Sequence, residues 1–171
     1  MHENNRRWLA DLQRAYPDHF HHARVLELGS HIWGTPPHDT IRPYFTECHY
    51  VGVDALPGPG VDIAVHARDT QFRTGEFDTL AIFSMFEHDP DWRTSLRHNL
   101  GWLRPGGLLV TCFGAEGNAP HLMDWAIVPH REFLDYCTQD TGLDILDAFF
   151  EEERYGINCA GCYNVVGRKS A

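Results

Sequence analysis

The sequence predicts an α/β fold, with a doubly wound, mostly parallel sheet of about seven strands between two layers of helices. Short apolar runs of strand length alternate with helices or loops over most of the 171 residues. Two runs, 78–84 and 108–113, are almost wholly apolar, as expected of strands buried on both faces. Two strands near 143–153 and 161–168 are joined by a link too short for a parallel crossover, so one of them should run antiparallel.

The helices are placed by apolar residues at helical spacing. Residues 3–16 show this pattern, and Pro17 ends it. Residues 91–103 repeat it until Arg104-Pro-Gly-Gly107, and a third helix is expected over 131–141. The expected strands, in chain order, are 24–28, 50–54, 61–65, 78–84, 108–113, 143–150 and 163–167. A long loop over 31–43 and a turn at 56–60 separate the first three strands.

Length, charge and hydropathy limit the number of domains, the class of substrate and the location that are expected. A chain of 171 residues suits a single domain, 1–171, with one core. The net charge of −10 and the lack of a basic cluster argue against a nucleic-acid substrate and favour a small molecule. No apolar run approaches the ~20 residues of a membrane span. The polar start of the chain does not resemble a secretion signal, so a cytoplasmic protein is expected.

Cysteines and histidines do not form a recognisable metal motif. Cys159 and Cys162 make one C-x-x-C, but a zinc site needs about four ligands and the chain has no second pair. A structural role for this pair is favoured, with a redox or metal role as the alternative. The run from His19 to His22 is interpreted as a solvated turn, so no metal is expected.

Polar side chains follow the ends of the first four strands, where an open parallel sheet binds its ligands. Asp54 ends the second strand, 54 − 29 = 25 residues after Gly29, against ~20 in dinucleotide-binding sites. A carboxylate there can accept hydrogen bonds from both ribose hydroxyls. The alternative is that Asp54 merely caps the turn before LPGPG.

Four segments together resemble class I S-adenosylmethionine-dependent methyltransferases. FDTLAIFSMFEHDPDW (77–92) is similar to the family's fourth strand and its turn, and LRHNLGWLRPGGLLV (96–110) to its helix, PGG turn and fifth strand. YVGVDALPGPGVDIAVHARD (50–69) and the first loop, which opens with Gly29-Ser30, resemble one subgroup. The resemblance covers roughly residues 22–113 and implies a Rossmann-like methyltransferase fold.

The resemblance also implies S-adenosylmethionine as cofactor and S-adenosylhomocysteine as product. In the family, the position of Asp54 binds ribose, and the two residues after it line adenine. The backbone at Ser84 and Met85 corresponds to the site of the methionine amine. The implied cofactor-binding residues are Glu27, Gly29, Ser30, His31, Asp54, Ala55, Leu56, His66, Ala67, Ser84 and Met85.

The first loop departs from the family, because His31 and Trp33 occupy the positions of its second and third glycines. A dinucleotide needs glycine there so that the backbone can reach the pyrophosphate. S-adenosylmethionine has no phosphate, so the departure argues against NAD more than against this cofactor. His66 stands where the family often has Asp, and a neutral imidazole can still accept one hydrogen bond.

The expected function is in-line methyl transfer to a small-molecule acceptor. A base is needed only if the acceptor carries a tightly held proton. His88 is the candidate base, although it could instead cap the following helix; His31 and His121 are further candidates. Trp33, Trp92 and Trp125 could line a substrate pocket, but aromatic residues at such positions are more often core, above all Trp92, which belongs to a helical apolar stripe. The alternative function is an inactive, methyltransferase-like binding or scaffold subunit.

Overall fold

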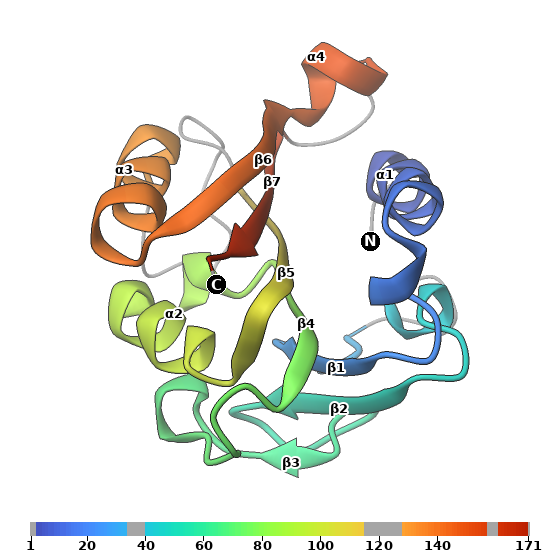
Figure 1. The fold of residues 1–171 in the computed structure, drawn as a ribbon, viewed down its shortest axis with the longest axis vertical. Helices are drawn as coiled ribbons and strands as arrows, with labels where there is room; N and C mark the ends of the chain where they lie inside the picture. The colour runs from blue at the N-terminus through green and yellow to red at the C-terminus, as the bar shows by residue number, and fades with distance from the viewer. Residues whose placement is uncertain (1–2, 34–39, 115–127, 157–160, 171) are drawn as a thin grey trace.

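The computed structural model describes residues 3–33, 40–114, 128–156 and 161–170, and these form one sheet flanked by helices (Figure 1). The strand order is β3-β2-β1-β4-β5-β7-β6. All neighbours pair in parallel except β7, which runs antiparallel to both β5 and β6. The strands are β1 (Arg24–Leu28), β2 (His49–Asp54), β3 (Ile63–Ala64), β4 (Phe77–Phe83), β5 (Leu103–Gly114), β6 (Leu143–Phe150) and β7 (Cys162–Lys169). The predicted fold class is confirmed.

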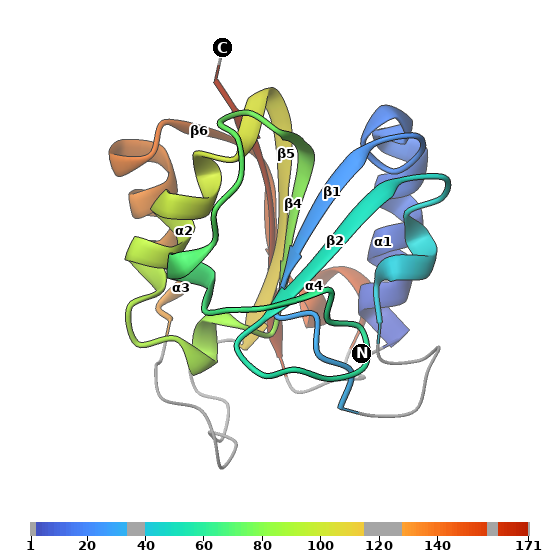
Figure 2. The same cartoon turned by 90° about the horizontal axis from the view of Figure 1, so that it is seen from below.

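Helices cover both faces of the sheet (Figure 2). Helix α1 (Glu3–Ala15) lies on one face. Helices α2 (Trp92–Leu100) and α3 (His130–Asp135) lie on the other, and α3 continues into a π-helical turn, Tyr136–Asp140. The short α4 (Glu151–Tyr155) links β6 to β7. None of the described helices is long and apolar enough to cross a membrane.

Two hydrophobic cores, one on each face, follow from the alternation of side chains along the strands. In β1, Val25 packs into the core that contains Trp8 of α1. Leu26 and Leu28 point to the opposite face and pack into the core that contains Trp92 of α2. The side chains of Val25, Leu26 and Leu28 are each 0% exposed. Trp92 is 3% exposed, so its expected place in the core is confirmed.

The third expected strand, 61–65, shrinks to two exposed residues, Ile63–Ala64. Turn and side-chain hydrogen bonds supplement the backbone hydrogen bond from the Asp62 N–H to the carbonyl of Gly52 in β2. The Val61 N–H donates to the carbonyl of Gly58, and the Asp62 carboxylate accepts the Gly52 N–H at 2.7 Å. This strand lies at the sheet edge, where only one neighbour can pair with it.

The Pro-Gly-Gly segment lies inside a strand rather than in a turn before it. Helix α2 ends at Leu100, and β5 already begins at Leu103. The pairing with β4 then jumps, from Phe77 opposite Leu103 to Thr79 opposite Leu108. The residues of β5 between these two pairs therefore bulge out, which shortens the expected helix and lengthens the expected strand.

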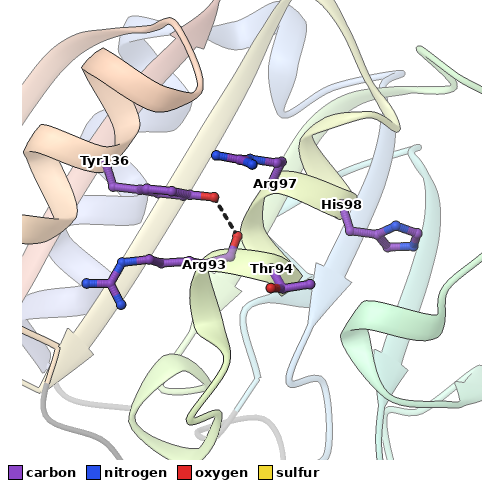
Figure 3. A pocket seen from close by; sticks show the side chains of 5 residues that line it. All are labelled: Arg93, Thr94, Arg97, His98 and Tyr136. Atoms are coloured by element: carbon purple, nitrogen blue, oxygen red, sulfur yellow. Dashed lines mark hydrogen bonds between the residues drawn. The ribbon is translucent and has the colours of Figure 1, made fainter.

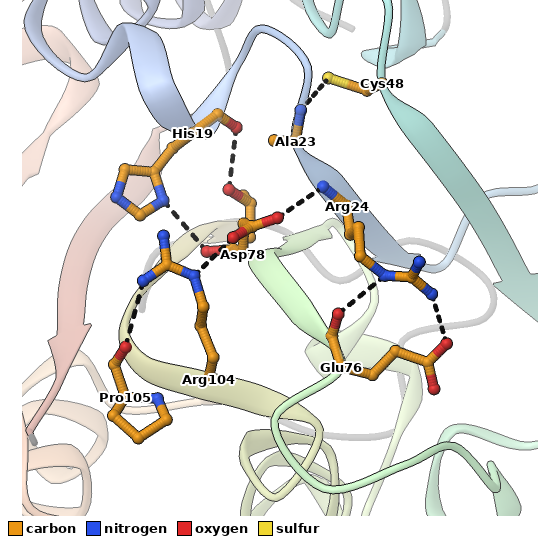
Figure 4. A network of polar contacts seen from close by, with 9 residues as sticks. His19, Ala23, Arg24, Cys48, Glu76, Asp78, Arg104 and Pro105 are labelled. Atoms are coloured by element: carbon orange, nitrogen blue, oxygen red, sulfur yellow. Dashed lines mark hydrogen bonds and ion pairs between the residues drawn. The ribbon is translucent and has the colours of Figure 1, made fainter.

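A half-buried acid ties the amino ends of the central strands together (Figure 4). Asp78 of β4 accepts the Arg24 N–H of β1 at 2.7 Å and an N–H of the Arg104 side chain in β5. Its backbone carbonyl lies 3.0 Å from His19 Nδ1, and the hydroxyl of Thr79 donates to the carbonyl of His19. These contacts fix β1, β4 and β5 at the edge opposite the candidate site.

We expect Asp78→Asn to lower the free energy of unfolding by about 1–3 kcal/mol at pH 7, because it removes the charge opposite Arg104. Burial by itself raises the pKa of Asp78, but the hydrogen bond from the Arg24 amide and the Arg104 guanidinium outweigh it and lower that pKa. The stabilisation is therefore present above the carboxyl's unfolded pKa and is lost as the pH falls through the lower, folded value.

Urea denaturation at several pH values tests this prediction, with Asp144→Asn, an exposed residue of β6, as the matched control. The difference between wild type and Asp78→Asn should shrink in acid. A difference that is the same at pH 3 and pH 7 would contradict it.

Candidate functional site

The loops that follow β1, β2 and β4 meet at one edge of the sheet. Strand β1 lies between the other two, with Leu28 opposite both Val53 and Ile82. The segments after these strands therefore start next to one another at one edge of the sheet; they are residues 29–31, 54–56 and 84–85. This is the carboxyl edge, where the sequence places most of its candidate residues.

Asp54 joins two of these loops through its side chain. Its Oδ2 accepts the His31 N–H at 3.1 Å, and its Oδ1 accepts the Leu56 N–H at 3.0 Å. The second bond caps the turn after β2, as the alternative interpretation expects. A carboxylate offers about four lone-pair positions, so two backbone bonds leave acceptor capacity for a ligand.

Gly29 is required where it stands. Its φ is +79°, and a Cβ at this position would lie 2.9 Å from the Cβ of Met85. Its N–H donates to the carbonyl of Val53 at 2.9 Å. Gly29 therefore lets the first loop pass closely over the end of β4.

Ser84, at the end of β4, also has a positive φ, of 48°. A non-glycine residue in this region is uncommon and often marks a functional site. Its N–H is fixed by the carbonyl of Cys112 at 2.8 Å, and its side chain is exposed. The backbone at Ser84 and Met85 is thus shaped by β5 and presented at the edge.

The bulky first loop fits because the turn that faces it is rich in glycine. The His31 ring lies against Gly58, where a Cβ would meet its Nε2 at 2.0 Å. The Ile32 N–H donates to the carbonyl of Pro59 at 2.9 Å, and a Cβ at Gly60 would meet the carbonyl of Ser30 at 2.5 Å. Glycines 58 and 60 thus provide the space that the loop itself, without its usual glycines, does not.

Apolar side chains are exposed at this edge. Trp33 is 71% exposed and its ring lies 4.3 Å from that of His31, measured between centroids. Leu56, after β2, is 47% exposed. Exposed apolar side chains in loops at a strand edge can cover the apolar part of a ligand.

Glu27 lies apart from these exposed residues, buried on the α1 face of β1. It is 6% exposed, and its Oε2 accepts the hydroxyl proton of Tyr50 at 2.7 Å. Burial raises the pKa of Glu27 to about 7, and the Tyr50 hydrogen bond opposes that rise. The sequence gives no signal for Tyr50, because only the pairing of β1 with β2 brings it to Glu27.

A buried hydrogen-bond network positions the loop after β3, where His66 is exposed and Ala67 half-buried. Asn99 of α2 donates to the carbonyl of Ala67 at 2.7 Å, and its Oδ1 accepts the Thr70 hydroxyl at 2.9 Å. Trp102 Nε1 donates to the same hydroxyl at 3.0 Å. Sequence reasoning missed Asn99, although a polar residue beside Leu100 on a buried helix face was a usable signal.

The candidate base His88 and the histidine run from 19 to 22 lie at different edges of the sheet. His88 is exposed in the turn after β4, and its N–H donates to the carbonyl of Met85 at 3.0 Å. His121, like Trp125, lies outside the described residues. His19 is only 9% exposed and bonds to Asp78 at the opposite edge, so the histidine run from 19 to 22 is only partly the solvated turn that we expected.

A shallow hollow between α2 and the turn after α3 is a separate feature (Figure 3). It is lined by Arg93, Thr94, Arg97, His98 and Tyr136. Arg93 pairs with Glu132, Arg97 lies 3.8 Å from Asp140, and the hydroxyl of Tyr136 donates to the carbonyl of Arg93. Because its two arginines are already paired with acids, the hollow is a poor anion site.

Comparison with known proteins identifies the fold. No family model matches the sequence, and no curated protein matches it. A structure of Burkholderia thailandensis 1,6-didemethyltoxoflavin-N1-methyltransferase, with bound 1,6-didemethyltoxoflavin and S-adenosylhomocysteine, aligns at a TM-score of 0.73 and 16% identity, over 99% of this chain and 80% of that one. The N-methyltransferase NodS of Bradyrhizobium japonicum aligns at 0.70 and 15%, over 98% and 97%.

A third similar structure, the [4+2]-cyclase SpnF, aligns at a TM-score of 0.69 and 15% identity, over 96% of this chain and 80% of that one. Likenesses at such identities show a shared architecture and not a shared reaction. The chain has the fold of class I S-adenosylmethionine-dependent methyltransferases.

The raised pKa of Glu27 predicts an unusual pH dependence. The folded protein holds this proton up to about pH 7, whereas the ordinary carboxyl pKa is 4.5. Stability should therefore fall as the pH rises from 4.5 to 7. Glu27→Gln stays neutral and can still accept from Tyr50, so we expect it to raise the free energy of unfolding at pH 8 by roughly 1–3 kcal/mol.

Urea denaturation of wild type and Glu27→Gln at pH 5 and pH 8 measures this effect. The variant should gain stability over the wild type only at the higher pH. If the free energies of unfolding of the two proteins differ by the same amount at both pH values, burial of the Glu27 carboxylate does not destabilise the protein at high pH.

Proposed function

We propose that this protein, which has the fold of class I S-adenosylmethionine-dependent methyltransferases, is itself such an enzyme and acts on a small-molecule acceptor by in-line methyl transfer. The net charge of −10 favours a small molecule over nucleic acid as the acceptor. We also infer that residues 1–171 act as one domain in the cytoplasm.

The observation that carries the proposal is the arrangement around Asp54. Its carboxylate holds the loops after β1 and β2 together and keeps unused lone pairs at the carboxyl edge. Leu56, directly beyond it, exposes an apolar side chain. A ribose on Asp54 and an adenine over Ala55 and Leu56 would satisfy both features.

The rest of the edge suits the remaining part of S-adenosylmethionine. Gly29 leaves no room for even one carbon atom between itself and Met85, so the backbone of the first loop lies close over β4. The N–H groups of Ser30 and Ser84 already donate to the carbonyls of Val53 and Cys112, so the carbonyls of these serines and the N–H of Met85 would face the cofactor. When bound, the cofactor would supply a methyl group that is already activated, so the protein mainly aligns donor and acceptor.

We assign a secondary part of the cofactor site to His31, His66 and Ala67. His31 lies in the loop after β1 and His66 in the loop after β3, so both loops carry an imidazole. Ala67 follows His66 and has a short, half-buried side chain. Glu27 would contribute to the cofactor site indirectly. Its buried carboxyl accepts the Tyr50 hydroxyl and so holds β1 against β2, instead of facing the open edge.

An inactive binding or scaffold subunit is the second candidate. The specific observation in its favour is the first loop, whose His31 and Trp33 rings pack together at the edge. If these rings close the cofactor site, the fold persists without turnover.

Calorimetry with S-adenosylmethionine and S-adenosylhomocysteine, with NAD as the negative control, separates the two candidates. We expect both sulfur compounds to bind and NAD not to bind. Asp54→Ala should weaken binding by about 10–100-fold, since it removes charge-assisted hydrogen bonds and loosens the first loop. Asp144→Ala is the matched control and should bind normally. No binding of either compound at high micromolar concentration would favour the scaffold function.

We expect His88 to act as base if the acceptor loses its proton during transfer. His88→Ala should then lower kcat by about 10²–10⁴-fold and leave cofactor affinity unchanged. Release of S-adenosylhomocysteine in the presence of a metabolite extract measures turnover even while the acceptor is unidentified. His22→Ala, exposed at the other edge, is the control. Full turnover of the His88 variant would remove it as the base.

A further inference from the structure

We propose that Cys112, Glu151 and Cys162 form a binding site for a thiophilic divalent metal ion, with zinc as its best match. One ligand atom from each residue, a thiol sulfur or a carboxylate oxygen, lies within 4.8 Å of the other two. This spacing lets one ion contact all three after small side-chain movements. None of the three ligands belongs to the proposed cofactor site, although the carbonyl of Cys112 accepts the Ser84 N–H at its border.

The three residues converge from segments that are far apart in the sequence. Cys112 lies near the end of β5, Cys162 begins β7, and Glu151 is the first residue of α4. Antiparallel pairing of β5 with β7 places Gly114 opposite Cys162 and Cys112 opposite Asn164, so the two cysteines are diagonal neighbours. Sequence spacing could not reveal this set, and Cys159, outside the described residues, is not counted in it.

The site lies on the α1 face of the sheet and is closed to solvent. Cys112 and Cys162 belong to the same core as Trp8 of α1 and Phe149 of β6. Cys112 and Glu151 are 0% exposed and Cys162 is 7% exposed. A carboxylate and two thiols brought together in such a place are costly unless a cation or protons compensate them.

Binding of a divalent ion at this site would release protons from the two cysteines, because a coordinated thiol loses its proton to the solvent as the metal–sulfur bond forms.

Asn164 provides an independent observation. It lies directly opposite both Cys112 and Phe149 in the sheet, which places its side chain on the same face as the metal ligands. It is 0% exposed, and neither its Nδ2 nor its Oδ1 has a hydrogen-bond partner among the described residues. A tetrahedral ion with three protein ligands keeps one position for water, and Asn164 is placed to hydrogen-bond that water.

The ligand set selects the ion. Two thiolates favour soft or borderline metals such as zinc over magnesium or calcium, which prefer oxygen ligands. Burial favours an ion that holds elements together over one that exchanges ligands with substrates. Bound there, it would join β5, β7 and the β6–α4 junction, and so fasten the C-terminal hairpin to the central sheet.

The test uses the full chain, reduced and freed of metal, and titrated with Co²⁺ as a spectroscopic probe. We expect one ion per chain, a cobalt–thiolate charge-transfer band, and displacement of Co²⁺ by Zn²⁺. Zinc should also raise Tm. Cys112→Ser, Cys162→Ser and Glu151→Gln should each weaken binding at least tenfold. Cys137→Ser is the matched control, because Cys137 is equally buried but lies in the other core.

If a cysteine variant does not fold, the wild-type spectrum and the Glu151→Gln variant still decide the question. A wild type that takes up no Co²⁺ or Zn²⁺ in its reduced form overturns the proposal. So does metal binding that persists unchanged in both cysteine variants, because the ion would then lie elsewhere, for example at the exposed histidines.

Discussion

The structure depends on one short strand being buried on both faces. Strand β1 has only five residues, yet it pairs with β2 on one side and β4 on the other and contributes to both cores. Its first residue, Arg24, connects to Asp78 and to Glu76, so the amino edge is fixed by charge and hydrogen bonds. At the other end of β1, Leu28 is followed directly by Gly29 of the candidate site. A shift of β1 along its neighbours would therefore misplace both edges together.

Most strands and the antiparallel end of the sheet were predictable, because periodicity and short links are local properties of the sequence. The bounds of β1 and β6 agree with the expectation, as does the antiparallel end of the sheet. The Pro-Gly-Gly segment was placed wrongly, because its residues read as a turn whereas pairing with β4 absorbs them as a bulge. Tertiary pairing overrides local turn preference there.

The candidate site was predictable only at the level of strand ends. Asp54 and Gly29 stood out because each follows an apolar run. The detailed geometry of the site depends on contacts between distant parts of the chain. Examples are the contact of Met85 with Gly29 and that of Gly58 with His31. The same limit hid Tyr50 beside Glu27 and the approach of Cys112 to Cys162. Side chains that converge across a sheet leave no periodic trace in the sequence.

The position of β7 has a consequence for synthesis on the ribosome. Strand β7 follows every other strand of the sheet in chain order, yet it fills the gap between β5 and β6. Until it emerges, β6 has no strand to pair with and the apolar edge of β5 is open. Helix α1, which precedes every strand of the sheet, also depends on this part of the chain, because Asn4 and Asp11 bond to Gly156 and Tyr155 beside that hairpin. Completion of the sheet is thus a late event, and the nascent chain must keep the β5 edge from pairing with other chains meanwhile.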